Sequence, residues 1–384
     1  MGIDIGVYGA RGIPSTYSGY ETFLSELLPR LAQRGHRITM YCRAGEVERR
    51  ETYQGVVLRH LPSVRTKSLS TVSHGGVAAV TARFAGHDVV LVVNVANALP
   101  AAVQTLTGQP VVLNTDGQEW LRGKWGPTAR RVFLSSARMA PRIATALVSD
   151  SVGMADVYRR QFGAETTTII PYMYLASTRP DLTRLEGEMG LAPGDFMLTG
   201  GRLVPENNTH RVAQAYVDSD CPLPLMVLGA ANYASPVTER LRELAASDSR
   251  VRFVGHVADR ALFVSLLAGA RRYIHAHSVG GINPSLVEAM GSGSAILALD
   301  TVFNREALGE TGEYFTDFEH ELPRLLNTTS QRSSQEQTLR AAAVERAVDL
   351  FNPDDVVSAY ERILVAASES TSTSHVALST RWSE

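Results

Sequence analysis

The chain has 384 residues, more than the roughly 250 to 300 at which a single hydrophobic core stops growing, so we expect two domains. Its residues are 44% hydrophobic and 20% charged, with a formal net charge of -2, which excludes a disordered chain and a generally basic nucleic-acid binder. The two cysteines, Cys42 and Cys221, form no CxxC pair and predict neither a disulfide framework nor a cysteine-rich zinc site.

The first residues lack the basic start and the apolar stretch of a secretory signal peptide. No apolar run approaches the roughly 20 residues that span a bilayer. We therefore expect a cytoplasmic protein whose contact with the inner face of the membrane, if any, is peripheral.

The N-terminal segment predicts a strand, a glycine-rich loop and a helix. An apolar run at 3–8 is followed by GARGIPSTYSGYE and then by Phe and Leu residues at helical spacing. The glycines do not have the GxGxxG spacing of a dinucleotide site. We predict that the loop faces an interdomain cleft and that its backbone, just before the helix, approaches a bound phosphate; a plain surface loop is an equal alternative. The loop residues assigned to the cleft are Gly12, Tyr17, Ser18 and Gly19.

Further short apolar runs alternate with helical patterns along the first half of the chain. Strands that alternate with helices predict a parallel, doubly wound sheet. The predicted strands are 37–42, 56–61, 87–93, 110–114 and 144–148.

The stretch NTDGQEWLRGKW at 114–125 combines carboxylates with Trp120 and Trp125, a composition that suits sugar binding. Open α/β sheets bind ligands outside the carboxyl ends of their strands, which is where Asp116 should lie. Asp116 is our first candidate for a general base or a contact to a sugar, and Glu119 is the second. A turn aspartate with a local hydrogen bond is the alternative.

The helical pattern that follows carries arginines beside apolar residues. This combination suits an anionic membrane surface, and a solvated helix face is about equally expected. The arginines are Arg130, Arg131, Arg138 and Arg142.

A polar, loop-like stretch at 177–194 predicts the domain joint, giving an N-terminal domain at 1–178 and a C-terminal domain at 179–350. Strand and helix patterns then alternate again and predict a second Rossmann-like domain. The predicted strands of this half are 196–199, 225–229, 251–255, 273–276 and 295–299, with a short one at 311–315.

The end of the chain has a helical pattern with a break at Asn352-Pro353. We expect 351–367 to form a helix that packs back on the N-terminal domain. The Ser/Thr-rich residues 368–384 predict a disordered tail.

The most informative stretch is HAHSVGGINPSLVEAMGSGSAILALD at 275–300. Asn283 suits an N-cap and Pro284 the first helical position, so the N–H groups of the next two residues, Ser285 and Leu286, should be available to a diphosphate at the positive end of the helix dipole. Glu288 lies about one turn further in, where its carboxylate can accept hydrogen bonds from sugar hydroxyls. A capped helix with turn glycines and a solvated glutamate is the alternative.

His275 and His277 alternate in the predicted strand and the residues after it. No third ligand follows at a recognisable spacing, so they predict no metal site. We expect one to face the cleft and the other to lie in the core.

Residues 288–291, Glu-Ala-Met-Gly, resemble the second half of the Glu-x7-Glu stretch of retaining GT-B glycosyltransferases of family 4. In that family the second glutamate holds the ribose of the donor nucleotide. By the family spacing the first glutamate would stand at 280, where this sequence has Gly280.

A second stretch, GGRLVPENN at 200–208, is similar to the family's Gly-Arg-Leu-Val-x-Glu-Lys-Gly, whose Arg and Lys bind the donor diphosphate. Arg202 stands at the arginine, whose fork geometry suits phosphate, and Asn207 stands at the lysine. Arg305 is a further candidate cation, and an interdomain salt bridge is the alternative role for Arg202. The predicted donor-binding residues are Arg202, Asn207, Gly280, Gly281, Ile282, Asn283, Pro284, Ser285, Leu286 and Glu288.

Together with the opening loop, DGQEWLRGKW and FNRE at 303–306, these stretches resemble rhamnosyltransferase-like enzymes of bacterial cell-wall and capsular polysaccharide assembly. The resemblance implies an α/β fold with two Rossmann-like domains facing across a deep cleft, a dTDP-rhamnose donor, a lipid-linked saccharide acceptor, retention of configuration, and no metal or cofactor. A sugar-nucleotide 2-epimerase of the same architecture and a catalytically silent sugar-nucleotide binding protein remain open, the latter because of Gly280 and Asn207.

Overall fold

The computed structural model describes residues 2–14, 19–64, 70–123, 125–174, 179–230, 235–329, 334–370 and 375–383. The chain forms two compact units. The first contains Met1–Tyr172 together with Pro353–Glu384, and the second contains Met173–Asn352. The first unit thus ends at Tyr172 rather than at residue 178, and the chain returns to it at Pro353.

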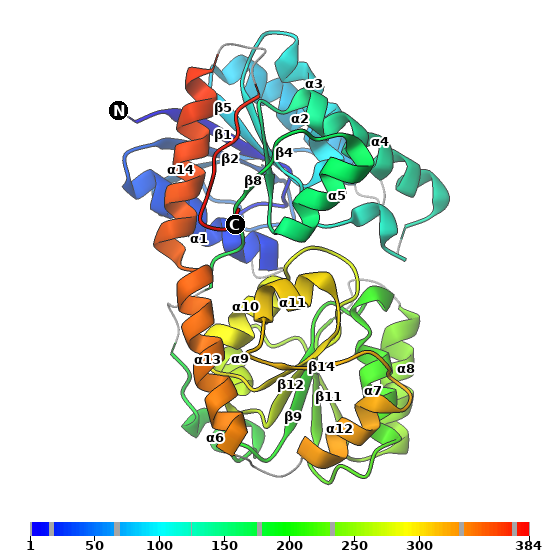
Figure 1. Ribbon diagram of the computed structural model, residues 1–384. Coiled ribbons are helices and arrows are strands. Elements are labelled where there is room, and N and C mark those ends of the chain that lie inside the picture. The colour runs from blue at the N-terminus through cyan, green and yellow to red at the C-terminus, as the bar shows by residue number, and fades with distance from the viewer. Residues whose placement is uncertain are drawn as a thin grey trace. The chain divides into compact units, whose positions relative to one another are not determined.

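The first unit is built on an eight-stranded sheet whose strands are parallel except for the β3–β4 pair (Figure 1). Every strand expected in this half is present. In spatial order the strands are β3 (Thr52–Tyr53), β4 (Val56–Leu61), β2 (Arg37–Arg43), β1 (Asp4–Tyr8), β5 (Val89–Val93), β6 (Val111–Asn114), β7 (Ala146–Ser149) and β8 (Thr168–Ile169). The two-residue strands β3 and β8 carry too few residues for a periodic pattern and were not expected.

Helices cover both faces of this sheet. The crossover from β1 to β2 runs in one direction along the sheet and those from β4 to β7 run in the other, so right-handed crossovers place α1 on one face and α2, α3 and α4 on the opposite face. The helix α14 packs beside α1 and against β5 and β6. The helices of this unit are α1 (Gly19–Gln33), α2 (Ser70–Ala85), α3 (Ala98–Thr105), α4 (Pro127–Ile143), α5 (Val152–Phe162) and α14 (Pro353–Glu369).

The second unit is built on a six-stranded, fully parallel sheet with a buried apolar cluster on each face. In spatial order its strands are β11 (Val251–Gly255), β10 (Leu225–Leu228), β9 (Met197–Gly200), β12 (Arg272–His275), β13 (Ile296–Leu299) and β14 (Glu313–Phe315). Its helices are α6 (Thr183–Met189), α7 (Thr209–Val217), α8 (Pro236–Ser247), α9 (Arg260–Gly269), α10 (Pro284–Gly291), α11 (Val302–Leu308), α12 (Glu321–Thr329) and α13 (Ser334–Leu350). The predicted class, α/β with two Rossmann-like domains, is confirmed.

The predicted break is observed, since α13 ends at Leu350 and α14 begins at Pro353. Pro353 has no N–H with which to continue the preceding helix. The prediction of a disordered tail was wrong for 375–383; residues 371–374 and 384 lie outside the described part. The Val376 N–H donates to the Thr145 carbonyl at 2.7 Å, and the Thr380 hydroxyl donates to the Ile169 carbonyl at 2.7 Å. Hydroxyl-rich composition suggested disorder, whereas here these groups pair with residues at the β7–β8 edge.

Candidate functional site

The strand order of the second unit contains a topological switch point. The chain begins this sheet at β9, moves outward to β10 and β11, and then resumes on the other side at β12. The loops that follow β9 and β12 therefore leave in opposite directions, which opens a crevice for ligands outside the carboxyl ends of these two strands. These loops are the two stretches, 200–208 and 276–283, that the sequence marked for donor binding.

The two loops are held together by hydrogen bonds. Ser278 donates its N–H and its hydroxyl to the Glu206 carbonyl, each at 3.0 Å, and the Asn208 amide donates to the Ala276 carbonyl at 2.9 Å. Gly201 has φ 149, and a Cβ there would lie 2.7 Å from Nε2 of His277. Only glycine allows this approach, so the loops form a defined platform.

The helix α10 begins at the predicted cap, but its first amides are not free. The Asn283 side chain accepts from the Ser285 N–H at 3.0 Å, and the Asn283 carbonyl accepts from the Leu286 N–H at 2.9 Å. The prediction that these two N–H groups are available was therefore wrong, because the cap that starts the helix also occupies them.

The available amides lie one loop earlier. The backbone N–H groups of 279–283 donate to no acceptor in the described part of the chain, and Gly280 has φ 129, a conformation that favours glycine. Pro284 has no N–H, and the side chains of Ile282 and Leu286 are buried in the core. Gly280, Gly281, Ile282 and Asn283 can thus meet a ligand through their backbone, next to the positive end of a helix dipole.

Arg202 supplies the charge of this platform. It is half-buried and makes no side-chain hydrogen bond or ion pair with any described residue. The Asn207 side chain is buried and donates to the Arg202 carbonyl at 2.8 Å, so it supports the loop instead of offering a donor outward. Arg305 forms a two-pronged ion pair with Asp300, at 2.9 and 2.7 Å, and is engaged there.

Glu288 forms an ion pair with Arg260, the first residue of α9. The pair joins two helices that follow different strands, and it was not predicted from the sequence. It places a mostly buried carboxylate on α10, one turn beyond the loop amides.

Both His275 and His277 are buried, whereas one of them was expected to face the cleft. His275 is fully buried, and burial lowers its pKa to about 3, so its imidazole is neutral. His277 is also buried, and its Nδ1 contacts the Asn283 amide nitrogen, which orients the cap. Neither side chain is exposed, and no group of three or more His, Cys, Asp or Glu in the described residues is arranged to hold a metal ion.

In the first unit, polar residues follow three neighbouring strands. Asn94 follows β5, Asp116 follows β6 and Asp150 follows β7. Asn94 and Asp116 have φ values of 67 and 52, and such left-handed backbone in residues other than glycine is often found at functional sites. The predicted position of Asp116 at the carboxyl edge is thus observed.

Two neutral side chains donate hydrogen bonds to the Asp116 carboxylate. The Tyr172 hydroxyl donates to one oxygen at 3.3 Å, and the Asn94 amide donates to the other at 3.4 Å. The Asp116 N–H in turn donates to the Asn114 side chain at 2.9 Å, whose amide nitrogen donates to the Tyr360 hydroxyl at 2.6 Å. These bonds fix the orientation of the carboxylate.

Tyrosines surround the two aspartates. Burial, followed by the negative charges of Asp116 and Asp150, raises the pKa of Tyr158 and Tyr172 far above its ordinary value, so both phenols stay protonated. The pKa of Tyr20 is also raised well above its ordinary value, by burial and then by Tyr360 and the same aspartates. The Tyr20 ring lies edge-on to that of Tyr172. This cluster and Asp150 were not predicted from the sequence, although an aspartate directly after a predicted strand was the available signal.

Glu119 does not have the geometry of a general base. It is buried, forms an ion pair with Arg122, and accepts from the Trp125 indole N–H at 3.0 Å. Both carboxylate oxygens are therefore committed, and the residue fixes the turn after β6. Of the two candidates in this stretch, the structure favours Asp116.

The opening loop is described only in part. Gly12 is buried and has φ 136, and a Cβ there would lie 2.8 Å from Sγ of Cys42, so close packing requires this glycine. Gly19 is exposed and begins α1. Tyr17 and Ser18 lie outside the described residues.

The comparisons with known proteins agree with this architecture. Residues 18–173 match the Glycosyl transferase 4-like domain. No curated protein matches the chain. The matched range includes β6, Asp116 and the tyrosines Tyr158 and Tyr172.

Solved structures of similar fold cover both units of the chain. HepE from Anabaena in complex with UDP-glucose has a TM-score of 0.77 at 17% identity, over 95% of this chain and 100% of that chain. Sucrose-phosphate synthase from Thermosynechococcus elongatus has a TM-score of 0.76 at 17% identity, over 95% and 100%. WaaG, a glycosyltransferase involved in lipopolysaccharide biosynthesis, has a TM-score of 0.74 at 14% identity, over 94% and 99%. The fold is that of GT-B proteins.

The matched range 18–173 also contains α4. Arg130, Arg131, Arg138 and Arg142 are all exposed, and none forms an ion pair with a described carboxylate. No helix among the described residues is both long and apolar enough to span a bilayer.

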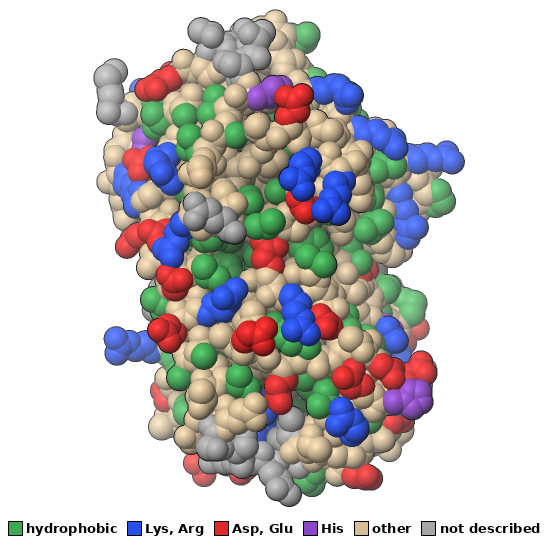
Figure 2. All heavy atoms as spheres, viewed as in Figure 1, with side chains coloured by type: hydrophobic (Ala, Val, Ile, Leu, Met, Phe, Trp, Pro, Cys, Tyr) green, Lys and Arg blue, Asp and Glu red, His purple; other side chains and the backbone are tan. Residues whose placement is uncertain are grey.

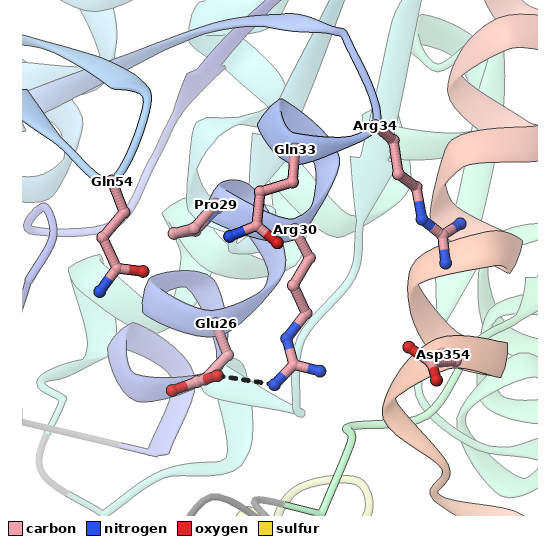
Figure 3. A pocket seen from close by; sticks show the side chains of 7 residues that line it. All are labelled: Glu26, Pro29, Arg30, Gln33, Arg34, Gln54 and Asp354. Carbon is pink, nitrogen blue, oxygen red and sulfur yellow. Dashed lines mark hydrogen bonds and ion pairs between the residues drawn. The ribbon is translucent and has the colours of Figure 1, made fainter.

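The first unit also has a polar hollow beside α1 (Figure 3). Its lining includes Arg30 in the C-terminal half of α1 and Arg34 directly after the helix, and Arg30 pairs with Glu26 at 3.0 Å. Because α1 follows β1 and runs back along the sheet, this half of the helix lies toward the edge where the strands begin. We therefore assign the hollow no part in the site.

Proposed function

We propose that the protein is a glycosyltransferase that holds a nucleotide-diphosphate sugar on the switch-point loops of its second unit. The observation that carries the proposal is the run of backbone N–H groups at 279–283 that donate to no described residue, together with the half-buried guanidinium of Arg202. Backbone amides before a helix N-terminus and a guanidinium fork are both suited to phosphate oxygens. The same groups would stabilise the negative charge that grows on the leaving diphosphate.

The comparisons support the reaction class. The first unit matches a glycosyl transferase 4-like domain, and the similar structures include HepE with UDP and with UDP-glucose. One fold can host many reactions, so the chemistry depends on the residues at the strand edges. Glu288 is proposed to accept hydrogen bonds from the ribose hydroxyls of the donor, with Arg260 holding its carboxylate in place.

Asp116 is proposed to act on the acceptor. In the transfer, the acceptor hydroxyl oxygen forms a bond to the anomeric carbon, the bond from that carbon to the diphosphate breaks, and the hydroxyl proton passes to Asp116. The Tyr172 and Asn94 contacts orient the carboxylate for this role.

The finer proposal follows the resemblance of the sequence. The donor is dTDP-rhamnose, the acceptor is a lipid-linked saccharide, the anomeric configuration is retained, and no metal or cofactor is required. Gly280 removes the carboxylate that family members use at this position, so the donor sugar is expected to be read by other groups.

The test is a panel of nucleotide-sugars assayed for thermal stabilisation and then for turnover with an acceptor. A true donor stabilises the fold by about 2.7 kcal/mol at a hundred times its dissociation constant, and dTDP-rhamnose should do so best. Release of dTDP in the presence of acceptor and excess chelator supports the proposal. Stabilisation without turnover would indicate a silent binding protein, and conversion of the donor sugar to its epimer would indicate an epimerase.

A further inference from the structure

The layer formed by α2, α3 and α4 carries charges of one sign, because all its Asp, Glu, Lys and Arg residues are arginines. The three helices lie side by side in chain order on one face of the first sheet. None of them contains an aspartate or a glutamate. An ordinary surface intersperses both signs of charge, so a continuous layer without acidic residues indicates a specific environment.

The layer has a defined end. Each helix follows one strand of a parallel sheet and leads to the next, so all three run back along the sheet and end at the edge where the strands begin. At this end Phe84 is the last but one residue of α2 and Leu106 directly follows α3, with 84% and 82% of their surface exposed. Large apolar side chains this exposed on neighbouring helix ends are typical of a binding surface.

Further apolar residues continue from this end along α2. Val77 and Val80 are exposed and stand seven and four positions before Phe84, the spacing of one helix face. Leu99 of α3 and Val132 of α4 are also exposed. The apolar ridge defined by Val77, Val80, Phe84 and Leu106 thus points away from the sheet.

Arginines lie beside this ridge on α4. Arg138 and Arg142 occupy the C-terminal half of the helix, near the end marked by Leu106. Arg142 donates to the Arg138 carbonyl at 2.7 Å, and both side chains remain exposed. Figure 2 shows Lys and Arg side chains gathered on the side where Figure 1 places α4.

We propose that the ends of α2, α3 and α4 dock on an anionic lipid surface, with Phe84 and Leu106 entering the headgroup region and the α4 arginines binding lipid phosphates. A protein bound at an interface needs both signals, because a small apolar insertion alone or a few charges alone bind weakly. A second copy of this chain fits poorly, since a two-fold axis would bring arginine-rich surfaces together. The inference rests on the proposed function in one respect: a lipid-linked acceptor is found at such a surface.

The test is flotation of the full chain with vesicles of phosphatidylcholine alone or phosphatidylcholine with phosphatidylglycerol. We expect binding to the anionic vesicles that weakens with salt. The double variants Phe84→Ser/Leu106→Ser and Arg138→Glu/Arg142→Glu should each lower partitioning at least about tenfold. Val302→Ser, at a residue 69% exposed on α11, and Arg324→Glu, at an exposed residue of α12, are matched controls that should bind as the wild type does.

Two outcomes overturn the proposal: unchanged partitioning of both double variants, or a dimer in solution that the Phe84→Ser/Leu106→Ser variant abolishes. The variants replace exposed side chains, and unchanged thermal midpoints will show that they fold. Stabilisation by dTDP, measured on the same samples, separates this proposal from the proposed function. Lipid binding without any nucleotide effect would contradict the enzyme assignment and leave the docking surface intact.

Discussion

The two units use the same topology to present opposite chemistry. At the carboxyl edge of the second sheet lie backbone N–H donors and the cation Arg202. At the carboxyl edge of the first sheet lie the carboxylates Asp116 and Asp150 among protonated tyrosines. The strand order determines where a ligand can bind, and the residues after each strand determine its charge. A positive edge suits an anionic leaving group, and an acidic edge suits an acceptor hydroxyl.

The largest expected effect of a substitution is the loss of turnover at Asp116, in the first unit. Asp116→Asn keeps the size of the side chain but removes the base, so turnover should fall roughly 10²- to 10⁴-fold. Nucleotide binding should be unchanged, because Asp116 belongs to the first unit. Steady-state kinetics and calorimetry with dTDP measure the two effects. Asp156→Asn, at a partly exposed residue of α5, is the control, and equal loss in both variants would count against a catalytic role.

The opposite pattern is expected at Arg202. Loss of a charged hydrogen bond to the diphosphate in Arg202→Ala should weaken dTDP binding roughly 10- to 100-fold. Arg240→Ala, which removes an exposed arginine of α8 from its pair with Glu243, should bind dTDP normally. Calorimetry of both variants decides the point. Normal affinity in Arg202→Ala would show that the positive edge does not bind the diphosphate.

Each unit also contains a buried neutral histidine, which predicts how stability depends on pH. Burial lowers the pKa of His275 to about 3, and burial with the Arg43 charge lowers that of His74 to about 4. The ordinary value is 6.5, so below that pH the unfolded chain binds protons that the folded chain does not, and the free energy of unfolding falls. From about pH 7 to about pH 5 each residue should contribute a loss of about 2 kcal/mol.

Urea unfolding at the two pH values measures this loss. His275→Gln in the second unit should reduce it, whichever way the substitution changes stability at neutral pH. An unchanged pH dependence in that variant would mean that His275 titrates normally in the folded protein.

The smallest effect is expected at Tyr172, which orients Asp116 without touching the reacting atoms. Tyr172→Phe removes one hydrogen bond of 3.3 Å to the carboxylate and should lower kcat about three- to tenfold. The KM for the donor should not change, whereas a general loss of structure would alter both constants. Tyr53→Phe on β3 is the control, since its hydroxyl contacts only the exposed Gln54 among described residues.

The strands and the break before Pro353 could be predicted because short apolar runs, helical spacing and proline act locally. The positions of Arg202, Asn283 and Asp116 followed from the same patterns, since each comes directly after a predicted strand or before a predicted helix. The sequence could not show which groups are already occupied. Glu119 is neutralised by Arg122, and the Ser285 and Leu286 amides are taken by the Asn283 cap.

The remaining misses depend on contacts between distant segments. Tyr172 and Tyr360 reach the Asp116 loop from positions 56 and 246 residues away from their partners in the chain. The pairing of 375–383 with the β7–β8 edge is similarly remote, and hydroxyl-rich composition gave no sign of it. Such contacts follow from packing and leave no periodic pattern in one sequence.

The most direct test of the central claim is a crystal structure of the protein with dTDP. We predict that the diphosphate oxygens lie within hydrogen-bond distance of backbone N–H groups at 279–283 and of the Arg202 guanidinium. A nucleotide bound in any other part of the chain, or a diphosphate that contacts neither group, would contradict the account.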